Sequence, residues 1–131
     1  MKKIGILNQP ISAVIAGLGH TDMLVIADAG LPIPPEVDRI DLALVQGVPG
    51  FLQTVEAVLR EMKVDKVIAA NETDDNSPHI AEGLKALLPD VPFEWVTHAR
   101  LKELSNEAVA VISTGELTPY ANVILVAGVT F

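Results

Sequence analysis

The stretch Met23-Leu24-Val25-Ile26-Ala27 is a continuous apolar run, rich in branched side chains, that ends at Asp28. A short run of this kind, without alternation, is typical of a β-strand that is buried on both faces. Such strands occur in parallel sheets that carry helices on both sides. Residues 29–35 contain three prolines. Because proline fixes the backbone and removes an N–H donor, this segment predicts an ordered loop beyond the strand.

Outward from this strand, helical and extended patterns alternate along the chain. The clearest helix is the amphipathic pattern over residues 47–62, and the polar, acidic residues 71–77 predict a loop. We expect helices over 10–18, 47–62, 78–88 and 98–104, and strands over 23–27, 37–42, 64–70, 93–97, 108–113 and 121–126. This order predicts the α/β class, as one three-layer α/β/α domain over residues 1–131 with a mostly parallel sheet.

Composition narrows the function classes. The formal net charge is −8 and no basic patch interrupts it, which argues against nucleic-acid binding. Cysteine is absent, so thiolate chemistry is excluded. No apolar run reaches the roughly 18 residues of a membrane span, and the first ten residues do not resemble a secretory signal, so we expect a cytoplasmic protein without membrane insertion. Half of the residues are hydrophobic in a short chain, which predicts apolar surface buried between the subunits of a homo-oligomer.

Two candidate site residues flank the first strand. His20 lies in a turn before it, and a histidine there can donate or accept a proton near neutral pH. The alternative is an ordinary surface histidine, which the local pattern alone favours. Asp28 lies at the carboxyl end of the strand, where α/β sheets bind ligands and where a carboxylate can accept hydrogen bonds from sugar hydroxyls. An Asx turn that bends the chain into Gly30 explains Asp28 equally well.

Further candidates follow later strands. His98 comes after the strand over 93–97, on the same expected sheet edge as Asp28, although it could simply cap a helix. Tyr120 and Asn122 flank Ala121, and an extended backbone would point both side chains to one face, which suits a polyhydroxylated ligand. Bonds that close a turn are the alternative, and spacing alone favours it. No two histidines have the close spacing of a metal site, so no metal is expected.

Several short strings resemble the ribose pyranase and fucose mutarotase family. They are Leu18-Gly19-His20-Thr21-Asp22, Ala27-Asp28-Ala29-Gly30-Leu31-Pro32-Ile33-Pro34, Thr114-Gly115-Glu116, Pro119-Tyr120-Ala121-Asn122 and Ala127-Gly128-Val129. The resemblance spans nearly the whole chain, favours the ribose branch, and is weakest over residues 71–96.

This resemblance implies a function and residue roles. His20 falls on the family's proton donor, and Asp28, His98 and the segment Tyr120-Ala121-Asn122 fall on sugar-binding positions. It also implies a cytoplasmic, ring-like homo-oligomer, a decamer of two pentamers, with D-ribose sites between subunits and no metal or organic cofactor.

The implied activity is the interconversion of ribopyranose and ribofuranose by general acid-base ring opening and closure, in support of ribose uptake and catabolism. Two alternatives stay open. One is a non-catalytic ribose-binding accessory protein of a transporter or regulator, and the other is a mutarotase of another monosaccharide.

Overall fold

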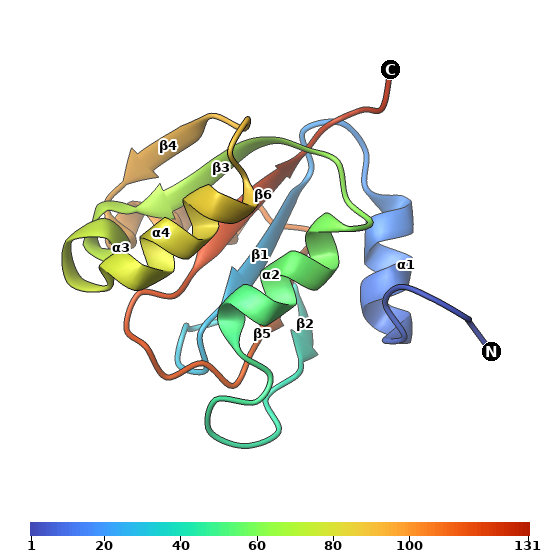
Figure 1. Ribbon diagram of the computed structural model, residues 1–131, viewed down its shortest axis with the longest axis horizontal. Helices are drawn as coiled ribbons and strands as arrows, with labels where there is room; N and C mark the ends of the chain where they lie inside the picture. The colour runs from blue at the N-terminus through green and yellow to red at the C-terminus, as the bar shows by residue number, and fades with distance from the viewer.

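The computed structural model describes residues 1–131 and contains one six-stranded sheet with helices on both faces (Figure 1). The elements, in chain order, are α1 (Gln9–Gly17), β1 (Met23–Ala27), β2 (Asp38–Asp41), α2 (Phe51–Leu59), β3 (Val64–Ala70), α3 (Asn71–Asn76), α4 (Pro78–Leu87), β4 (Phe93–Val96), α5 (His98–Ser105), β5 (Ala110–Ser113) and β6 (Val123–Ala127). The α/β class is confirmed.

The sheet has the order β2-β5-β1-β6-β3-β4. The pairs β1–β5, β2–β5 and β3–β4 are parallel, whereas β6 is antiparallel to both of its neighbours, β1 and β3. Five strands therefore share one direction, as the sequence predicts for a mostly parallel sheet, and β6 runs against them. The amino end of β6 consequently lies at the same sheet edge as the carboxyl ends of the other strands.

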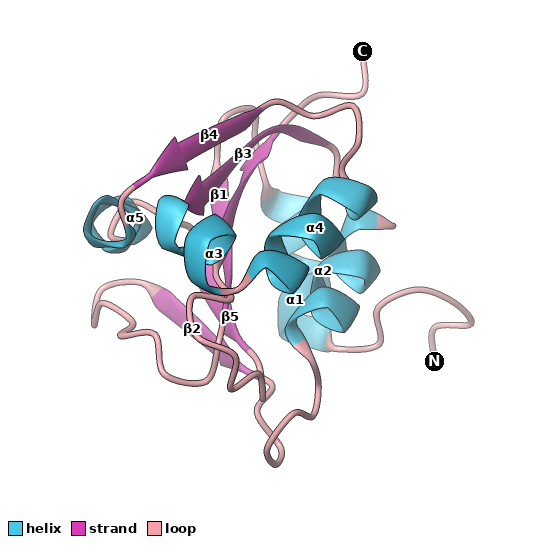
Figure 2. Ribbon diagram, turned by 60° about the vertical axis from the view of Figure 1, so that its left-hand side comes forward, coloured by secondary structure: helices cyan, strands magenta, loops and turns pink.

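The sheet divides the interior into two apolar layers. Leu24 and Ile26 of β1 pack with α1, α2 and α4 on one face, while Val25 and Ala27 pack with α5 and the loop after β1 on the other. Figure 2 shows α1, α2 and α4 together on one side of the strands and α5 alone on the other. These four of the five β1 residues are fully buried, which confirms that the strand is buried on both faces from Leu24 onward. The three-layer arrangement is thereby confirmed.

Two predicted segments differ from the structure. The helix expected over 47–62 begins only at Phe51, because Pro49 lies in the preceding turn and the extended Gly50 is the N-cap. It ends at Leu59, three residues before the expected end. Residues 71–76, expected to be a loop, form the short helix α3, and only Thr73 of that helix is buried. A helix with one buried residue has no apolar periodicity for a sequence pattern to reveal.

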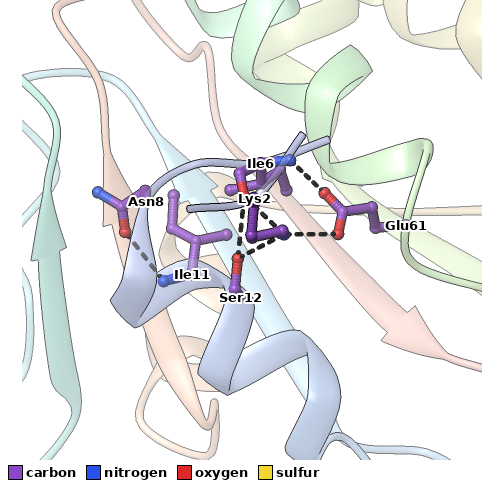
Figure 3. Close-up of polar contacts among 6 residues, drawn as sticks. All are labelled: Lys2, Ile6, Asn8, Ile11, Ser12 and Glu61. Atoms are coloured by element: carbon purple, nitrogen blue, oxygen red, sulfur yellow. Dashed lines mark hydrogen bonds and ion pairs between the residues drawn. The ribbon is translucent and has the colours of Figure 1, made fainter. Parts of the chain in front are cut away.

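The N-terminal arm is tied to the end of α2 by polar contacts (Figure 3). The Glu61 carboxylate accepts a hydrogen bond of 2.6 Å from the Ile6 N–H and lies 3.7 Å from the Lys2 ammonium. The Lys2 ammonium also donates to the Ile6 carbonyl at 2.7 Å. Asn8 then caps α1 by accepting from the Ile11 N–H at 3.0 Å. No helix is long and apolar enough to span a membrane.

Candidate active site

Five of the six candidate residues meet at one edge of the sheet. Asp28 follows the carboxyl end of β1, His98 follows that of β4, and residues 120–122 precede β6, whose amino end reaches the same edge because the strand is antiparallel. A cleft of about 380 Å³ lies there. It is lined by Asp28, Gly30, Leu31, Pro32, His98, Glu116, Leu117, Pro119 and Tyr120.

Asp28 and Asn122 are joined by two hydrogen bonds. The Asp28 N–H donates to Asn122 Oδ1 at 2.9 Å, and Asn122 Nδ2 donates to Asp28 Oδ2 at 3.1 Å. Asp28 Oδ1 also accepts from the Gly30 N–H at 2.9 Å, which is the predicted Asx turn. Asn122 is fully buried behind Asp28. The amide therefore fixes the carboxylate, and the partly exposed Asp28 presents that carboxylate at the cleft.

His98 stands at the first position of α5, after the N-cap Thr97. Its backbone N–H donates to both oxygens of the Glu72 carboxylate, at 3.1 and 3.0 Å. Its ring meets that of Tyr120 edge-on, with centroids 5.1 Å apart and planes at 81°. The Nδ1 atom of His98 is buried and makes no hydrogen bond within the chain, whereas the His98 residue lines the cleft.

The prediction that Tyr120 and Asn122 share the face of an extended strand is wrong. β6 begins only at Val123, and Tyr120 has a left-handed backbone with φ of 62°. The turn sends the Tyr120 ring toward His98 and the Asn122 amide toward Asp28. Ala121 between them is fully buried. Both polar side chains reach the sheet edge through the turn instead of through strand alternation.

Glu116 is a cleft residue that the sequence reasoning did not single out, although it belongs to the Thr114-Gly115-Glu116 string. Burial alone would raise the pKa of its carboxyl. The Phe51 N–H and the Thr118 hydroxyl and N–H, which donate to the carboxylate, outweigh burial and hold the pKa below its ordinary value of 4.5. Glu116 is thus kept as an anion that joins the start of α2 to the wall of the cleft.

His20 lies at the opposite edge of the sheet. It precedes β1 whereas Asp28 follows it, and five extended residues span about 17 Å. The turn that carries it is well defined, since the Gly19 N–H donates to Asp22 Oδ2 at 2.7 Å and the Thr21 N–H donates to the Ala127 carbonyl at 2.9 Å. One chain therefore does not bring His20 to the cleft.

An unpredicted carboxylate lies beside His20. His20 Nε2 is 3.2 Å from Asp65 Oδ2, and the two side chains are 57% and 42% exposed. No signal in the sequence connected these residues, which are 45 positions apart. No three histidine or carboxylate side chains converge as a metal site would require.

The fold and the cleft define a class: an α/β protein with a small polar cleft at the carboxyl edge of its sheet, furnished with carboxylate, imidazole and phenol groups that suit a polyhydroxylated ligand. The chain belongs to the RbsD / FucU transport protein family, whose model matches residues 1–130.

Relatives and solved structures agree over the full length. The chain is 60% identical to the D-ribose pyranase of Chloroflexus aggregans and 56% identical to that of Symbiobacterium thermophilum, with both chains of each pair fully covered. It is 50% identical to Bacillus subtilis RbsD, solved in complex with D-ribose, with a TM-score of 0.97 and full coverage of both chains. The Streptococcus pneumoniae fucose mutarotase, solved with L-fucose, has a TM-score of 0.85 at 23% identity over the whole of both chains and supports the fold alone.

Proposed function

We propose that this protein is an isomerase of the D-ribose pyranase type, which interconverts the pyranose and furanose forms of D-ribose. The observation that carries the proposal is the cleft itself, where Asp28, His98 and Tyr120 surround a space of sugar size. Full-length identity of up to 60% to D-ribose pyranases supports the reaction, and 50% identity to a protein solved with D-ribose supports the substrate.

The reaction needs only proton transfers. A proton is delivered to the ring oxygen O5 while the anomeric hydroxyl loses its proton, so that the C1–O5 bond breaks and the open-chain aldehyde forms. The O4 hydroxyl then attacks C1, loses its proton, and the carbonyl oxygen takes one up to close the furanose. General acid-base catalysis typically contributes about a hundred- to ten-thousandfold, which suits a reaction that also proceeds unaided. No metal or organic cofactor is part of the proposal.

In this proposal the cleft holds the sugar. The Asp28 carboxylate accepts from sugar hydroxyls, while Asn122 keeps that carboxylate in place. The His98 imidazole and the Tyr120 hydroxyl supply further hydrogen bonds, and the Ala121 backbone completes the segment between the two polar side chains. His20 is the proton donor to the ring oxygen.

Since His20 lies at the far edge of its own sheet, we infer that the cleft of one chain is completed by His20 of the partner subunit in a homo-oligomer. Exposed apolar side chains support such an assembly. Leu117 lines the cleft and is 55% exposed, and it also lines a neighbouring hollow with Leu44 and Val45, which are 76% and 62% exposed. The ring-like decamer of two pentamers, the single domain over residues 1–131 and the cytoplasmic location belong to the same proposal. Sedimentation and cell fractionation test the assembly and the location.

Saturation-transfer NMR on equilibrated D-ribose tests the reaction. We expect catalytic amounts of protein to accelerate transfer between pyranose and furanose anomeric signals. The variant His20→Ala should lose about a hundredfold or more of this rate while ribose binding persists. His79→Ala is the matched control, because His79 is an exposed histidine that does not line the cleft and affects it only through its charge near Glu116. Ribose binding without acceleration by the wild-type protein would favour an accessory binding protein, and acceleration only with another sugar would favour a different mutarotase.

Mixing two inactive variants tests the shared site. His20→Ala leaves an intact cleft, and Asp28→Ala leaves an intact His20. If each site takes its cleft from one subunit and its histidine from the next, subunits mixed at equal amounts should recover about a quarter of the activity. No recovery after verified subunit exchange would refute the shared site.

A further inference from the structure

We propose that Thr73, together with Ser77, is a positioning residue that sets the direction of the Tyr120 side chain in the sugar cleft. The expected effect on ribose binding and KM rests on the proposed function, whereas the expected effect on the position of the Tyr120 ring concerns the protein without sugar. Thr73 lies in α3 and Ser77 directly follows that helix, in the segment where the family resemblance is weakest.

Two buried hydroxyls hold two successive carbonyls. Thr73 Oγ1 donates to the Tyr120 carbonyl at 2.7 Å, and Ser77 Oγ donates to the Pro119 carbonyl at 2.7 Å. Thr73 is fully buried and Ser77 is 2% exposed, so water does not compete for these bonds. Ser77 stands at the N-cap of α4, yet its side chain makes no capping bond and is directed to the cleft wall.

The backbone of Tyr120 needs such support. Its φ of 62° is a left-handed conformation that residues with a Cβ adopt rarely and that surrounding contacts must maintain. The two hydroxyls donate to the Pro119 carbonyl, which precedes the Tyr120 N–Cα bond, and to the Tyr120 carbonyl, which follows it. They therefore fix the orientation of the peptide planes on both sides of Tyr120. That orientation sets the direction of the Tyr120 Cα–Cβ bond, from which the phenol ring extends.

The same short helix also holds the second ring of the cleft. Glu72, next to Thr73, accepts from the His98 N–H with both carboxylate oxygens. The rings of His98 and Tyr120 meet edge-on, with centroids 5.1 Å apart. The backbones of both residues are thus held by α3. α3 therefore sets the distance between two groups assigned to the sugar, although none of its side chains lines the cleft.

The variant Thr73→Val tests the proposal, because it removes the hydroxyl and nearly preserves the shape. We expect the dissociation constant for D-ribose to rise about tenfold, which corresponds to the loss of one buried hydrogen bond. KM should rise in parallel with kcat changed less than about twofold, because a misplaced sugar-holding group weakens ground state and transition state alike. Thr73→Ser keeps the donor and should restore both binding and KM.

A readout without sugar separates positioning from general stability. Tyr120 is the only tyrosine in the chain, so fluorotyrosine labelling gives one ¹⁹F resonance for this ring. We expect Thr73→Val to shift or broaden that resonance and Thr73→Ser to leave it in place. Thr54→Val is the matched control, because Thr54 is also buried and also donates to a backbone carbonyl, that of Gly50 at 2.8 Å, but it lies outside the cleft.

The outcomes are distinct. An unmoved Tyr120 resonance and ribose affinity within about twofold of wild type in a folded Thr73→Val protein would overturn the proposal. If that variant does not fold, Ser77→Ala carries the test, and an unmoved resonance there overturns it as well. A wild-type protein that binds ribose without accelerating ring exchange would sink the proposed function while leaving the resonance test intact.

Discussion

Replacing Asn122 by Asp tests the hydrogen-bonded pair at the back of the cleft. The change is nearly isosteric and keeps the acceptor for the Asp28 N–H. It replaces the Nδ2 donor, however, by a second carboxylate oxygen that faces Asp28 Oδ2 at 3.1 Å in a fully buried position. The variant thus turns an attraction between an amide and a carboxylate into a repulsion between two carboxylates.

The cost follows from this distance. Two unit charges 3.1 Å apart repel by about 5 kcal/mol at an effective dielectric constant of about 20. The pair can escape by binding one proton, which for a carboxyl with an ordinary pKa of about 3.9 costs about 4 kcal/mol at pH 7 and about 1.5 kcal/mol at pH 5. The cheaper route is protonation, and the protonated carboxyl can again donate to Asp28.

The sign of the pH dependence is fixed by this route. Folding raises the pKa of the new carboxyl, so the variant is close to wild-type stability below about pH 4 and loses stability as the pH rises toward the raised value. We expect the free energy of unfolding to fall short of wild type by about 4 kcal/mol near pH 7 and by about 1.5 kcal/mol near pH 5.

Urea unfolding of both proteins at equal concentration and at both pH values measures the difference. Gln9→Glu adds the same charge at an exposed position in the first turn of α1, away from the cleft, and should show little pH dependence. A deficit for Asn122→Asp that is equal at both pH values within about 0.5 kcal/mol would refute the pairing, since repulsion between carboxylates must weaken as one binds a proton.

Two further predictions concern Glu116 and Glu61. Glu116→Gln should lower the free energy of unfolding by about 1 to 2 kcal/mol near pH 7. Because folding lowers the pKa of Glu116, its contribution to stability is present above pH 4.5 and is lost as the pH falls through the lowered value. Urea unfolding of both proteins down to about pH 3 should show the difference in unfolding free energy shrinking. A difference that stays constant would contradict the prediction. Glu61→Ala should speed hydrogen exchange at the Ile6 amide, because it removes the acceptor of that amide's hydrogen bond. The global free energy of unfolding should change by less than about 1 kcal/mol. Unchanged exchange at Ile6 would contradict the role of Glu61.

The strands were the most predictable part of the fold. The strands predicted over 23–27 and 64–70 coincide with β1 and β3, because residues 24–27 and 67–70 are buried on both faces and leave short continuous apolar runs. The direction of β6 was not predictable, since a strand's own pattern is the same whether its neighbours run parallel or antiparallel. α3 was missed because only Thr73 in it is buried, so tertiary contacts rather than its own pattern define it.

The candidate site was predicted by position and completed by tertiary contacts. Placing Asp28 and His98 after strands put them correctly at one edge, and the same rule already separates His20 from them because it precedes β1. The left-handed Tyr120 and the support from Glu72 and Thr73 depend on contacts between distant segments. No pattern within a single segment encodes those contacts.

The central place of β6 bears on how the chain can fold during synthesis. β6 is the only strand that joins β2-β5-β1 to β3-β4, and residues 123–125 are fully buried. A chain that has not yet emerged past Ala127 therefore consists of two incomplete sheets, each with an unpaired inner edge. Assembly of the sheet must wait until β6 has left the ribosome, so the nascent chain exposes apolar strand edges until then, when chaperones can engage it.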